Sequence, residues 1–220
     1  MENKSILEAV QKLRKDSKKR KFKQTFDLIL NLKNIDIKNP EQKIDIFLKL
    51  PKPRAKQLKI CALVDDELIT EAKKHCNTVI HKDEFKTISK NKSKLRKIIN
   101  SHDFFITQPH LMPEVATAFG KSLGPKGKMP NPKAGCVIPP KVPLAPIAER
   151  LKATIRLQTK NDTIVKCAVG DENMKDEEIA ENIAAVFNAV LAKLPQKEAN
   201  IKSFLLKLTM GSPIPVEAKK

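Results

Sequence analysis

The hydrophobic pattern of this chain changes twice, and this change limits its fold more than any other feature of the sequence. Apolar and polar residues alternate in segments near both ends of the chain, at residues 26–32, 43–50, 154–158, 164–169 and 201–208. Alternation with a period of two predicts strands that bury one face and leave the other solvated. Between these segments, residues 59–64 are continuously apolar, as is typical of a strand covered on both faces.

The middle of the chain predicts a parallel sheet. Strand and helix patterns alternate there, with strands at 59–64, 78–80 and 103–107 and helices at 67–75, 92–100 and 113–122. This repeated strand–helix order is typical of a Rossmann-like sheet.

We therefore predict an α/β protein with two domains. Residues 1–53 and 151–220 form a discontinuous α+β sandwich-like domain of the split βαβ type. Residues 54–150 form an inserted Rossmann-like three-layer α/β domain. Two connections between the domains still permit them to open and close.

Helices and a hairpin complete the predicted discontinuous domain. A capping-box spacing at Ser5 begins an N-terminal helix. Three acidic residues open a helix at 176–194, which Pro195 stops. The strands at 154–158 and 164–169 are interpreted as a hairpin whose turn is Lys160-Asn-Asp162.

The charge of the chain indicates a polyanionic partner. The sequence holds 43 Lys and Arg against 25 Asp and Glu, a formal net charge of +18, so nucleic acid and an anionic membrane are the candidates. No apolar run approaches the roughly 20 residues of a membrane-spanning helix. No helix combines a strong apolar face with a basic one, which disfavours a membrane surface.

Catalytic motifs are not found. Gly124-Pro-Lys-Gly-Lys128 resembles part of a phosphate-binding loop, but its glycines are too close together and Met129 stands where a hydroxyl is needed. The turn Val64-Asp-Asp-Glu67 carries three acids, which would repel a pyrophosphate. We expect no catalytic residues, no cofactor and no metal. A nucleotide-dependent enzyme using the parallel domain is the alternative, and it would need such a loop.

The cysteines and histidines agree with the expectation that the chain has no catalytic or metal site. Single cysteines lie at Cys61, Cys76, Cys136 and Cys167, and the four histidines lack ligand spacing. We interpret the cysteines as reduced thiols of a cytosolic protein.

Two short segments are candidates for contact with nucleic acid. The strip from Lys18 to Lys23 is basic and contains Phe22, and Thr209-Met210-Gly211 ends the last strand. Lysines would meet phosphates, Phe22 would pack on a ribose or base, and the glycine would let an RNA backbone approach. A solvated charge run and a plain strand exit are the alternatives. The Lys86–Lys97 cluster is interpreted as a solvated face or a secondary contact.

A proline-rich basic loop, LGPKGKMPNPKAG at 123–135, interrupts the middle of the chain. It contains three of the six glycines, three prolines, no acid, and the lysines Lys126, Lys128 and Lys133. The hypothesis is that this loop faces the cleft toward the discontinuous domain, which carries the two candidate RNA-binding segments. There it would set the closure of the two domains or make a secondary RNA contact.

These motifs resemble the L-one family of large-subunit ribosomal proteins over the whole chain. The loop is similar to the family signature GP-[KR]-G-x-[ML]-P-x-P. Lys21-Phe22-x-x-Thr25, Ile179-Ala-Glu-Asn182, and Ser203 with Thr209-Met210-Gly211 resemble its other hallmarks. Three features resemble archaeal members of the family: the short N-terminus, Lys94-Leu-Arg-Lys97 and His102-Asp-Phe-Phe105. Two parts of the loop instead resemble the bacterial sequences, Asn131 and Lys133-Ala-Gly135.

The resemblance implies a function and a set of RNA-binding residues. It implies a non-enzymatic constituent of the large subunit that binds 23S-type rRNA, forms the mobile stalk near the E site and assists release of deacylated tRNA. It also implies repression of its own operon through the mRNA, a monomer outside the ribosome, and a cytoplasmic location. The implied RNA-binding residues are Lys21, Phe22, Thr25, Lys160, Ser203, Thr209, Met210 and Gly211.

Overall fold

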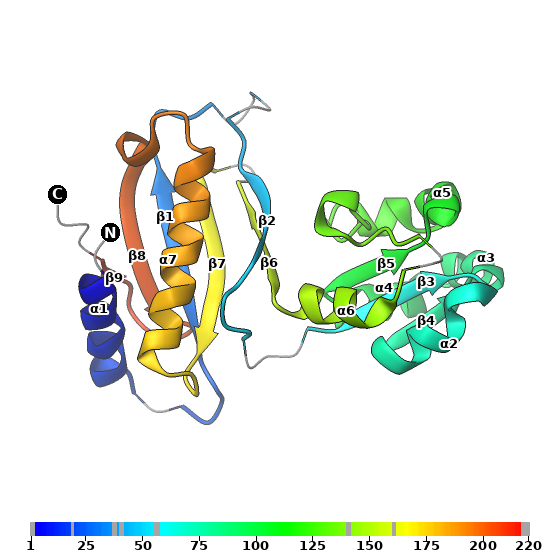
Figure 1. Ribbon diagram of the computed structural model, residues 1–220, viewed down its shortest axis with the longest axis horizontal. Coiled ribbons are helices and arrows are strands. Elements are labelled where there is room, and N and C mark those ends of the chain that lie inside the picture. Colours follow the sequence, from blue (N-terminus) through cyan, green and yellow to red (C-terminus); the bar gives the residue numbers. More distant parts are fainter. Residues whose placement is uncertain are drawn as a thin grey trace. The chain divides into compact units, whose positions relative to one another are not determined.

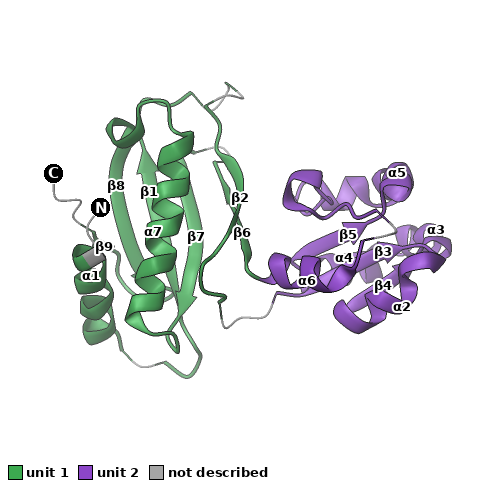
Figure 2. Cartoon of the chain, viewed as in Figure 1, with its two compact units in different colours: residues 1–56, 153–220 green, residues 57–152 purple. Residues whose placement is uncertain are grey.

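The chain forms two compact units of mixed α/β structure. The structure is a computed structural model that describes residues 3–18, 20–36, 39, 42–54, 58–139, 142–159 and 162–216. Unit 1 comprises residues 1–56 and 153–220, and unit 2 comprises residues 57–152 (Figure 2). Among the described residues, no helix is long and apolar enough to cross a membrane.

Unit 1 is built on a four-stranded antiparallel sheet with the order β7-β1-β8-β9 (Figure 1). Its strands are β1 (Thr25–Leu32), β7 (Ile164–Asp171), β8 (Ile201–Leu208) and β9 (Ile214–Pro215). The even-numbered residues of β1 are buried and the odd-numbered ones are half-buried, so the predicted alternation is confirmed. The two residues of β9 were not predicted, because so short a strand shows no periodicity.

Two helices supply the core beneath one face of this sheet. They are α1 (Asn3–Asp16) and α7 (Asp176–Lys193), and α7 runs along the sheet in Figure 1. Side chains such as Val10 of α1 and Ile183 of α7 are fully buried in one cluster with Phe26, Leu28 and Leu206. Each such burial stabilises the fold by about 1.5–3 kcal/mol. We call the opposite face, which carries the odd-numbered residues of β1 and β8, the open face.

The predicted hairpin between β6 and β7 is wrong. Strand β6 (Thr154–Gln158) pairs antiparallel with β2 (Asp45–Lys49), while β7 pairs with β1. Arg156 of β6 binds Asp45, which lies 111 residues earlier, through Nε–Oδ1 at 2.8 Å and Nη2–Oδ2 at 2.9 Å. Alternation with a period of two identifies the faces of a strand but not its partner. Residues 160 and 161 of the expected turn lie outside the described residues.

Unit 2 contains the expected parallel sheet. Strands β3 (Ile60–Val64), β4 (Thr78–His81) and β5 (Phe104–Thr107) have the order β4-β3-β5, and both neighbouring pairs are parallel. All five residues of the central strand β3 are buried, which confirms the interpretation of its apolar run. Among the described residues of unit 2, 3-10 turns lie at Lys82–Glu84, Pro109–Leu111 and Pro132–Ala134. Unit 1 has a 3-10 turn at Lys197–Asn200.

In the part of unit 2 that the structure describes, five α-helices accompany the parallel sheet. They are α2 (Asp66–His75), α3 (Phe85–Lys90), α4 (Lys92–Ser101), α5 (Met112–Leu123) and α6 (Leu144–Lys152). The sequence did not predict α3, because six residues hold too little periodicity. Its Phe85 packs edge-on against Phe119 of α5, with ring centroids 5.2 Å apart. Asn91 separates α3 from α4 and caps α4 by accepting from the backbone N–H of Lys94.

A buried asparagine of α7 holds the segment that leads out of unit 1. The side chain of Asn182 is fully buried. Its Oδ1 accepts from the backbone N–H of Lys52 at 3.0 Å, and its Nδ2 donates to the carbonyls of Lys52 and Val169 at 3.0 and 2.8 Å. One amide thus satisfies both backbone groups of Lys52 and fixes this segment against the sheet and helix of unit 1.

Replacing Asn182 with Ala should lower the free energy of unfolding by about 2–4 kcal/mol, because three backbone groups lose their side-chain partner. Urea unfolding measures this change. Glu181→Ala, at an exposed position on the same helix, is the control and should change stability by less than about 0.5 kcal/mol. Equal stability of the two variants would contradict the role of Asn182.

Candidate nucleic-acid interface

A pair of threonine hydroxyls joins the start of β1 to the end of β8. Thr25 Oγ1 and Thr209 Oγ1 lie 2.9 Å apart, and Thr209 Oγ1 also accepts from the backbone N–H of Thr25 at 3.0 Å. The backbone N–H of Thr209 donates to the carbonyl of Thr25 at 3.1 Å. These bonds extend the β1–β8 ladder past Phe26 and Leu208, which lie opposite each other. The ladder therefore brings together two sites that are 184 residues apart in the sequence.

The buried residue Gln24, which precedes β1, supports this pair of threonines through hydrogen bonds. Gln24 is 2% exposed, and its Nε2 donates to Glu172 Oε1 at 3.0 Å. Its backbone N–H donates to Glu172 Oε2 at 3.1 Å, and its Oε1 accepts from the backbone N–H of Met210 at 3.2 Å. The Thr209–Met210 turn is thereby fixed to the residue that precedes β1 and to the segment after β7. Sequence reasoning missed Gln24 and Glu172, since neither belongs to an alternating pattern.

Two large hydrophobic side chains at this end of the sheet are exposed to solvent. Phe22 is 50% exposed and Met210 is 61% exposed, and Val142 of unit 2 is the third exposed large hydrophobic residue among those described. Lys21 is also exposed, and so are Lys18, Arg20 and Lys23 of the basic strip. The structure thus places Lys21, Phe22, Thr25, Thr209 and Met210 at one end of the β1–β8 pair.

Gly211 lies directly beside this group. Its backbone N–H donates to the carbonyl of Leu208 at 2.9 Å, which closes the turn after β8. A Cβ at this position would lie 3.3 Å from the Cβ of Leu208, so a larger residue would require Leu208 to shift slightly.

Ser203 is not part of this group. It accepts from Asn31 Nδ2 at 2.7 Å, and Asn31 is its partner in the ladder. It lies six residues before Thr209, which follows the end of β8, a distance of about 20 Å at about 3.3 Å per residue. Ser203 nevertheless belongs to the odd-numbered row of β8, on the open face. Lys160, the remaining candidate, lies outside the described residues.

The open face between these ends carries a half-buried acid, Asp27, that the sequence analysis did not single out. Burial raises the pKa of Asp27, and Lys207, the hydroxyl of Thr25 and Arg54 act in the opposite direction. Asp27 and Lys207 occupy opposing positions on β1 and β8. The odd-numbered positions of the two strands could have revealed both residues, because period two places them beside Thr25 and Ser203 on one face.

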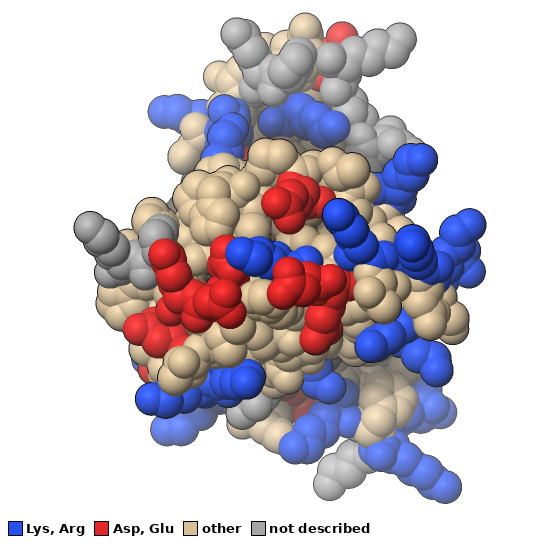
Figure 3. Space-filling model, turned by 90° about the vertical axis from the view of Figure 1, so that its right-hand side faces the viewer, with Lys and Arg blue, Asp and Glu red and all other residues tan. Residues whose placement is uncertain are grey.

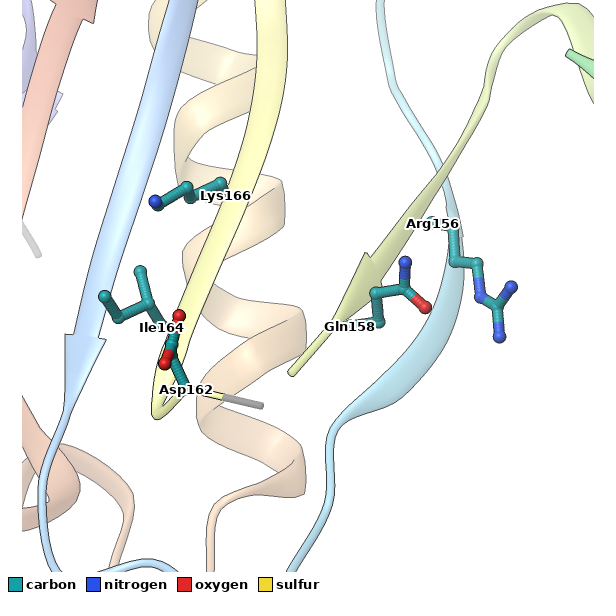
Figure 4. A pocket seen from close by; sticks show the side chains of 5 residues that line it. All are labelled: Arg156, Gln158, Asp162, Ile164 and Lys166. Atoms are coloured by element: carbon teal, nitrogen blue, oxygen red, sulfur yellow. The ribbon is translucent and has the colours of Figure 1, made fainter. Parts of the chain in front are cut away.

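A hollow among the described residues of unit 1 does not resemble an enclosed small-molecule site. This hollow, of about 330 Å³, lies between β6 and β7 and is lined by Arg156, Gln158, Asp162, Ile164 and Lys166 (Figure 4). In this view Lys166 extends toward β1, whereas Arg156 extends to the opposite side. Their charged groups therefore do not converge on a ligand, as they do in pockets that bind small molecules.

The lysines of the proline-rich loop contact the end of α4 within unit 2. Lys128 Nζ donates to the carbonyls of Ile99 and His102 at 2.8 and 2.5 Å, and Lys126 Nζ donates to Asn100 Oδ1. Cations at a helix C-terminus satisfy its last carbonyls and favour its dipole. Partial burial, followed by the nearby Lys126, lowers the pKa of Lys128, while Asp103 opposes this shift. Lys133 is exposed.

The far end of the loop joins the parallel sheet. Thr107 at the end of β5 donates its N–H to the carbonyl of Cys136 and accepts from the N–H of Ile138, both at 2.9 Å. Gly127 and Gly135 have positive φ angles of 65° and 74°, which glycine adopts without strain. The loop is thus fixed at both ends, to α4 and to β5.

The four cysteines are free, and Cys61 and Cys136 are buried. Burial raises the pKa of Cys61 and Cys167 to about 12 and that of Cys76 and Cys136 to about 11. These groups remain thiols at neutral pH, and a thiol is a poor nucleophile.

Comparison with known proteins places this basic α/β chain among the ribosomal proteins. It belongs to the ribosomal protein L1p/L10e family, whose model matches residues 13–212. The family predicted from the loop and the two strand-end motifs is therefore confirmed. The chain is a ribosomal constituent and not an enzyme, so the nucleotide-dependent enzyme is excluded.

Archaeal relatives match nearly the whole chain. The large ribosomal subunit protein uL1 of Methanothermococcus thermolithotrophicus is 41% identical over 99% of this chain and 100% of its own length. The protein of the same name from Methanocaldococcus jannaschii is 40% identical over 100% and 98% of the two chains. That from Pyrococcus abyssi is 40% identical over 96% and 95%.

Substitution of Lys128 by Met should lower the stability of unit 2 by about 1–2 kcal/mol, because two carbonyls at the end of α4 lose a charged donor. Thermal or urea unfolding provides the measurement. Lys133→Met, in the same loop but exposed, should change it by less than about 0.5 kcal/mol. If both variants were as stable as the parent protein, Lys128 would not cap α4.

Proposed function

We propose that this protein is a constituent of the large ribosomal subunit that binds 23S-type rRNA through the Thr25–Thr209 end of unit 1. The observation that carries the proposal is the pair of exposed hydrophobic side chains, Phe22 and Met210, that flank two linked hydroxyls. Phe22 and Met210 are 50% and 61% exposed. A folded protein leaves such groups in water at little benefit to its stability, so a partner that covers them explains their position.

The chemistry of this group suits RNA. Thr25 and Thr209 can exchange hydrogen bonds with ribose 2′-hydroxyls, which distinguish RNA from DNA. Phe22 and Met210 offer apolar surface to a ribose or an unstacked base, and the lysines of the 18–23 strip meet phosphates. The turn at Gly211 lets a nucleic-acid backbone approach the protein backbone closely.

The supporting scaffold makes this surface rigid before RNA arrives. Gln24 joins the Met210 turn to Glu172, and the threonines bind each other across the ladder. Groups that are already ordered lose little entropy on binding, which increases affinity. Ser203 and Lys207 extend the same open face, and Lys160 is part of the proposed RNA-binding set through the family resemblance.

The finer roles follow from the family and from the two units. In this proposal residues 1–53 and 151–220 form the discontinuous α+β RNA-binding domain, and residues 54–150 form the inserted Rossmann-like domain. The protein forms the mobile stalk near the E site, assists release of deacylated tRNA, and represses its own operon by binding the mRNA. It is cytoplasmic and monomeric outside the ribosome. The loop with Lys126, Lys128 and Lys133 makes a secondary contact or sets domain closure.

Met210→Ala should weaken binding of large-subunit rRNA by about 5–30-fold, the equivalent of about 1–2 kcal/mol, while leaving the unfolding midpoint unchanged. Fluorescence anisotropy, with the tightest-binding of a set of fragments that tile the rRNA, measures the affinity. Val142→Ala removes another exposed hydrophobic side chain and should bind within about twofold of the parent protein. Unchanged affinity in the Met210 variant would contradict the proposed site.

Binding should also weaken steeply with salt, because phosphate contacts release counterions. Lys21→Ala should reduce the slope of log affinity against log salt concentration by about 1, the contribution of one phosphate contact. Lys193→Ala, exposed at the end of α7, should leave the slope unchanged. Titrations at several potassium chloride concentrations provide the comparison, and identical slopes in both variants would remove Lys21 from the interface.

A further inference from the structure

A cluster of carboxylates and imidazoles lies at the C-terminal edge of the parallel sheet in unit 2. Asp65 and Asp66 follow β3, His81 ends β4, and Gln108 and His110 follow β5. The central strand β3 is joined to β4 on one side and to β5 on the other. The connections therefore diverge at this edge, the position at which open α/β sheets bind ligands. Sequence spacing concealed the cluster, since its members come from three separate strand ends.

The separations of His81 Nε2 from the two carboxylates match those between neighbouring ligands of a tetrahedral metal ion. His81 Nε2 lies 3.3 Å from Asp66 Oδ1 and 3.6 Å from Asp65 Oδ1. Each of these three residues offers one donor atom, and all three atoms lie within 4.8 Å of one another. Zinc bonds of about 2.0–2.2 Å to nitrogen and oxygen place neighbouring tetrahedral ligands about 3.3–3.6 Å apart.

A third carboxylate is positioned to orient the imidazole. Asp83 Oδ2 lies 3.1 Å from His81 Nδ1, a distance at which Nδ1–H can donate to it. This tautomer leaves the lone pair of Nε2 directed at the two other carboxylates. A carboxylate behind the non-ligating nitrogen is the usual second partner of a metal-binding histidine.

Buried polar atoms without a partner concentrate at this edge. Within the described part of the chain, His81 Nε2, Thr107 Oγ1 and Gln108 Nε2 are the buried side-chain atoms that lack a hydrogen-bond partner. Thr107 and Gln108 are fully buried, and the Gln108 carboxamide lies against the cluster, because its Oε1 accepts from the backbone N–H of Asp65 at 2.9 Å. Buried polar atoms are rarely left unpaired. A cation can complete the lone pair of His81 Nε2, whereas Gln108 Nε2 is an N–H donor and is not a metal ligand.

Two of the three grouped residues are carboxylates, which attract a cation although the whole chain is strongly basic. Figure 3 looks at the side of the molecule that lies at the right in Figure 1, where unit 2 is drawn. Acidic side chains gather in the middle of this face, and Lys and Arg side chains lie mostly toward its margins. Carboxylates repel phosphates, so an acidic face differs in charge from the basic strip proposed to contact RNA.

We propose that Asp65, Asp66 and His81 bind a divalent transition-metal ion of the zinc type, with Asp83 orienting the imidazole. A mixed set of one imidazole and two carboxylates favours zinc, cobalt or nickel over magnesium and calcium, which prefer oxygen ligands alone. His110 Nε2 lies 3.5 Å from Asp65 Oδ2 and provides a further imidazole at the same carboxylate.

A lysine competes with the metal for Asp65. Lys82 Nζ lies 2.9 Å from both Asp65 oxygens. The backbone N–H of Asp66 also donates to Asp65 Oδ1, at 2.8 Å. A metal ion must therefore displace the ammonium of Lys82 from Oδ1, which also accepts this N–H. Lys82 thus weakens the site, and its removal should strengthen it.

Calorimetric titration of the full-length protein with zinc chloride tests the proposal, and cobalt chloride provides a spectroscopic probe. The parent protein should bind one zinc ion with micromolar affinity. His81→Gln and Asp66→Asn should weaken binding at least tenfold, within the range known for lost ligands and their supports. Asp66 is 80% exposed, so its variant keeps the test valid if the His81 variant fails to fold. Lys82→Met should bind more tightly than the parent protein.

Matched controls distinguish zinc binding at the proposed site from general charge effects and from zinc binding by the cysteine thiols. His75→Gln and Lys86→Met change exposed residues of unit 2 and should leave zinc affinity within about twofold. The bound cobalt should show a d–d spectrum without a sulfur-to-cobalt charge-transfer band. Absence of binding, equal affinity in the Asp66 variant, or a sulfur band would overturn the proposal. Unchanged affinity in Lys82→Met would remove Asp65 Oδ1 from the ligand set.

Discussion

The antiparallel pairing of β1 with β8 is the interaction on which unit 1 depends. It joins a strand near the start of the chain to one near its end, with Phe26 opposite Leu208 and Asn31 opposite Ser203. The same ladder buries the even-numbered residues against α1 and α7 and turns the odd-numbered ones to the open face. Without it Thr25 and Thr209 would not meet, and the proposed RNA-binding surface would not exist. Stability and site geometry therefore share one set of backbone hydrogen bonds.

The charged residues of the chain divide into several physical roles that a net charge of +18 conceals. Lys18, Lys21 and Lys23 of the basic strip remain exposed. Lys128 is instead held by two carbonyls at the end of α4, and Lys82 is bound to Asp65. Only contacts distinguish a lysine available to a phosphate from one that stabilises the fold, because all of them look alike in the sequence.

Much of the fold followed from periodicity alone. The alternating strands, the continuously apolar β3 and the long helix α7 were all predicted, since each extends over enough residues to show its period. The helix α3 and the strand β9 were too short to do so. The hairpin of β6 and β7 was wrong because β6 pairs instead with β2, and no local pattern records a partner 111 residues away.

The sequence by itself determined which of the longer segments become strands, which faces of β1 and β8 are buried, and that the chain belongs to the ribosomal protein L1p/L10e family, whose motifs are local. Only the tertiary structure decided which of these segments meet. It placed Phe22, Thr25, Thr209 and Met210 at one end of a strand pair and Ser203 at the other. It also gathered Asp65, Asp66 and His81 at one edge of the parallel sheet. The physical reason is that side-chain periodicity is a property of each segment, whereas strand pairing is a property of the whole chain.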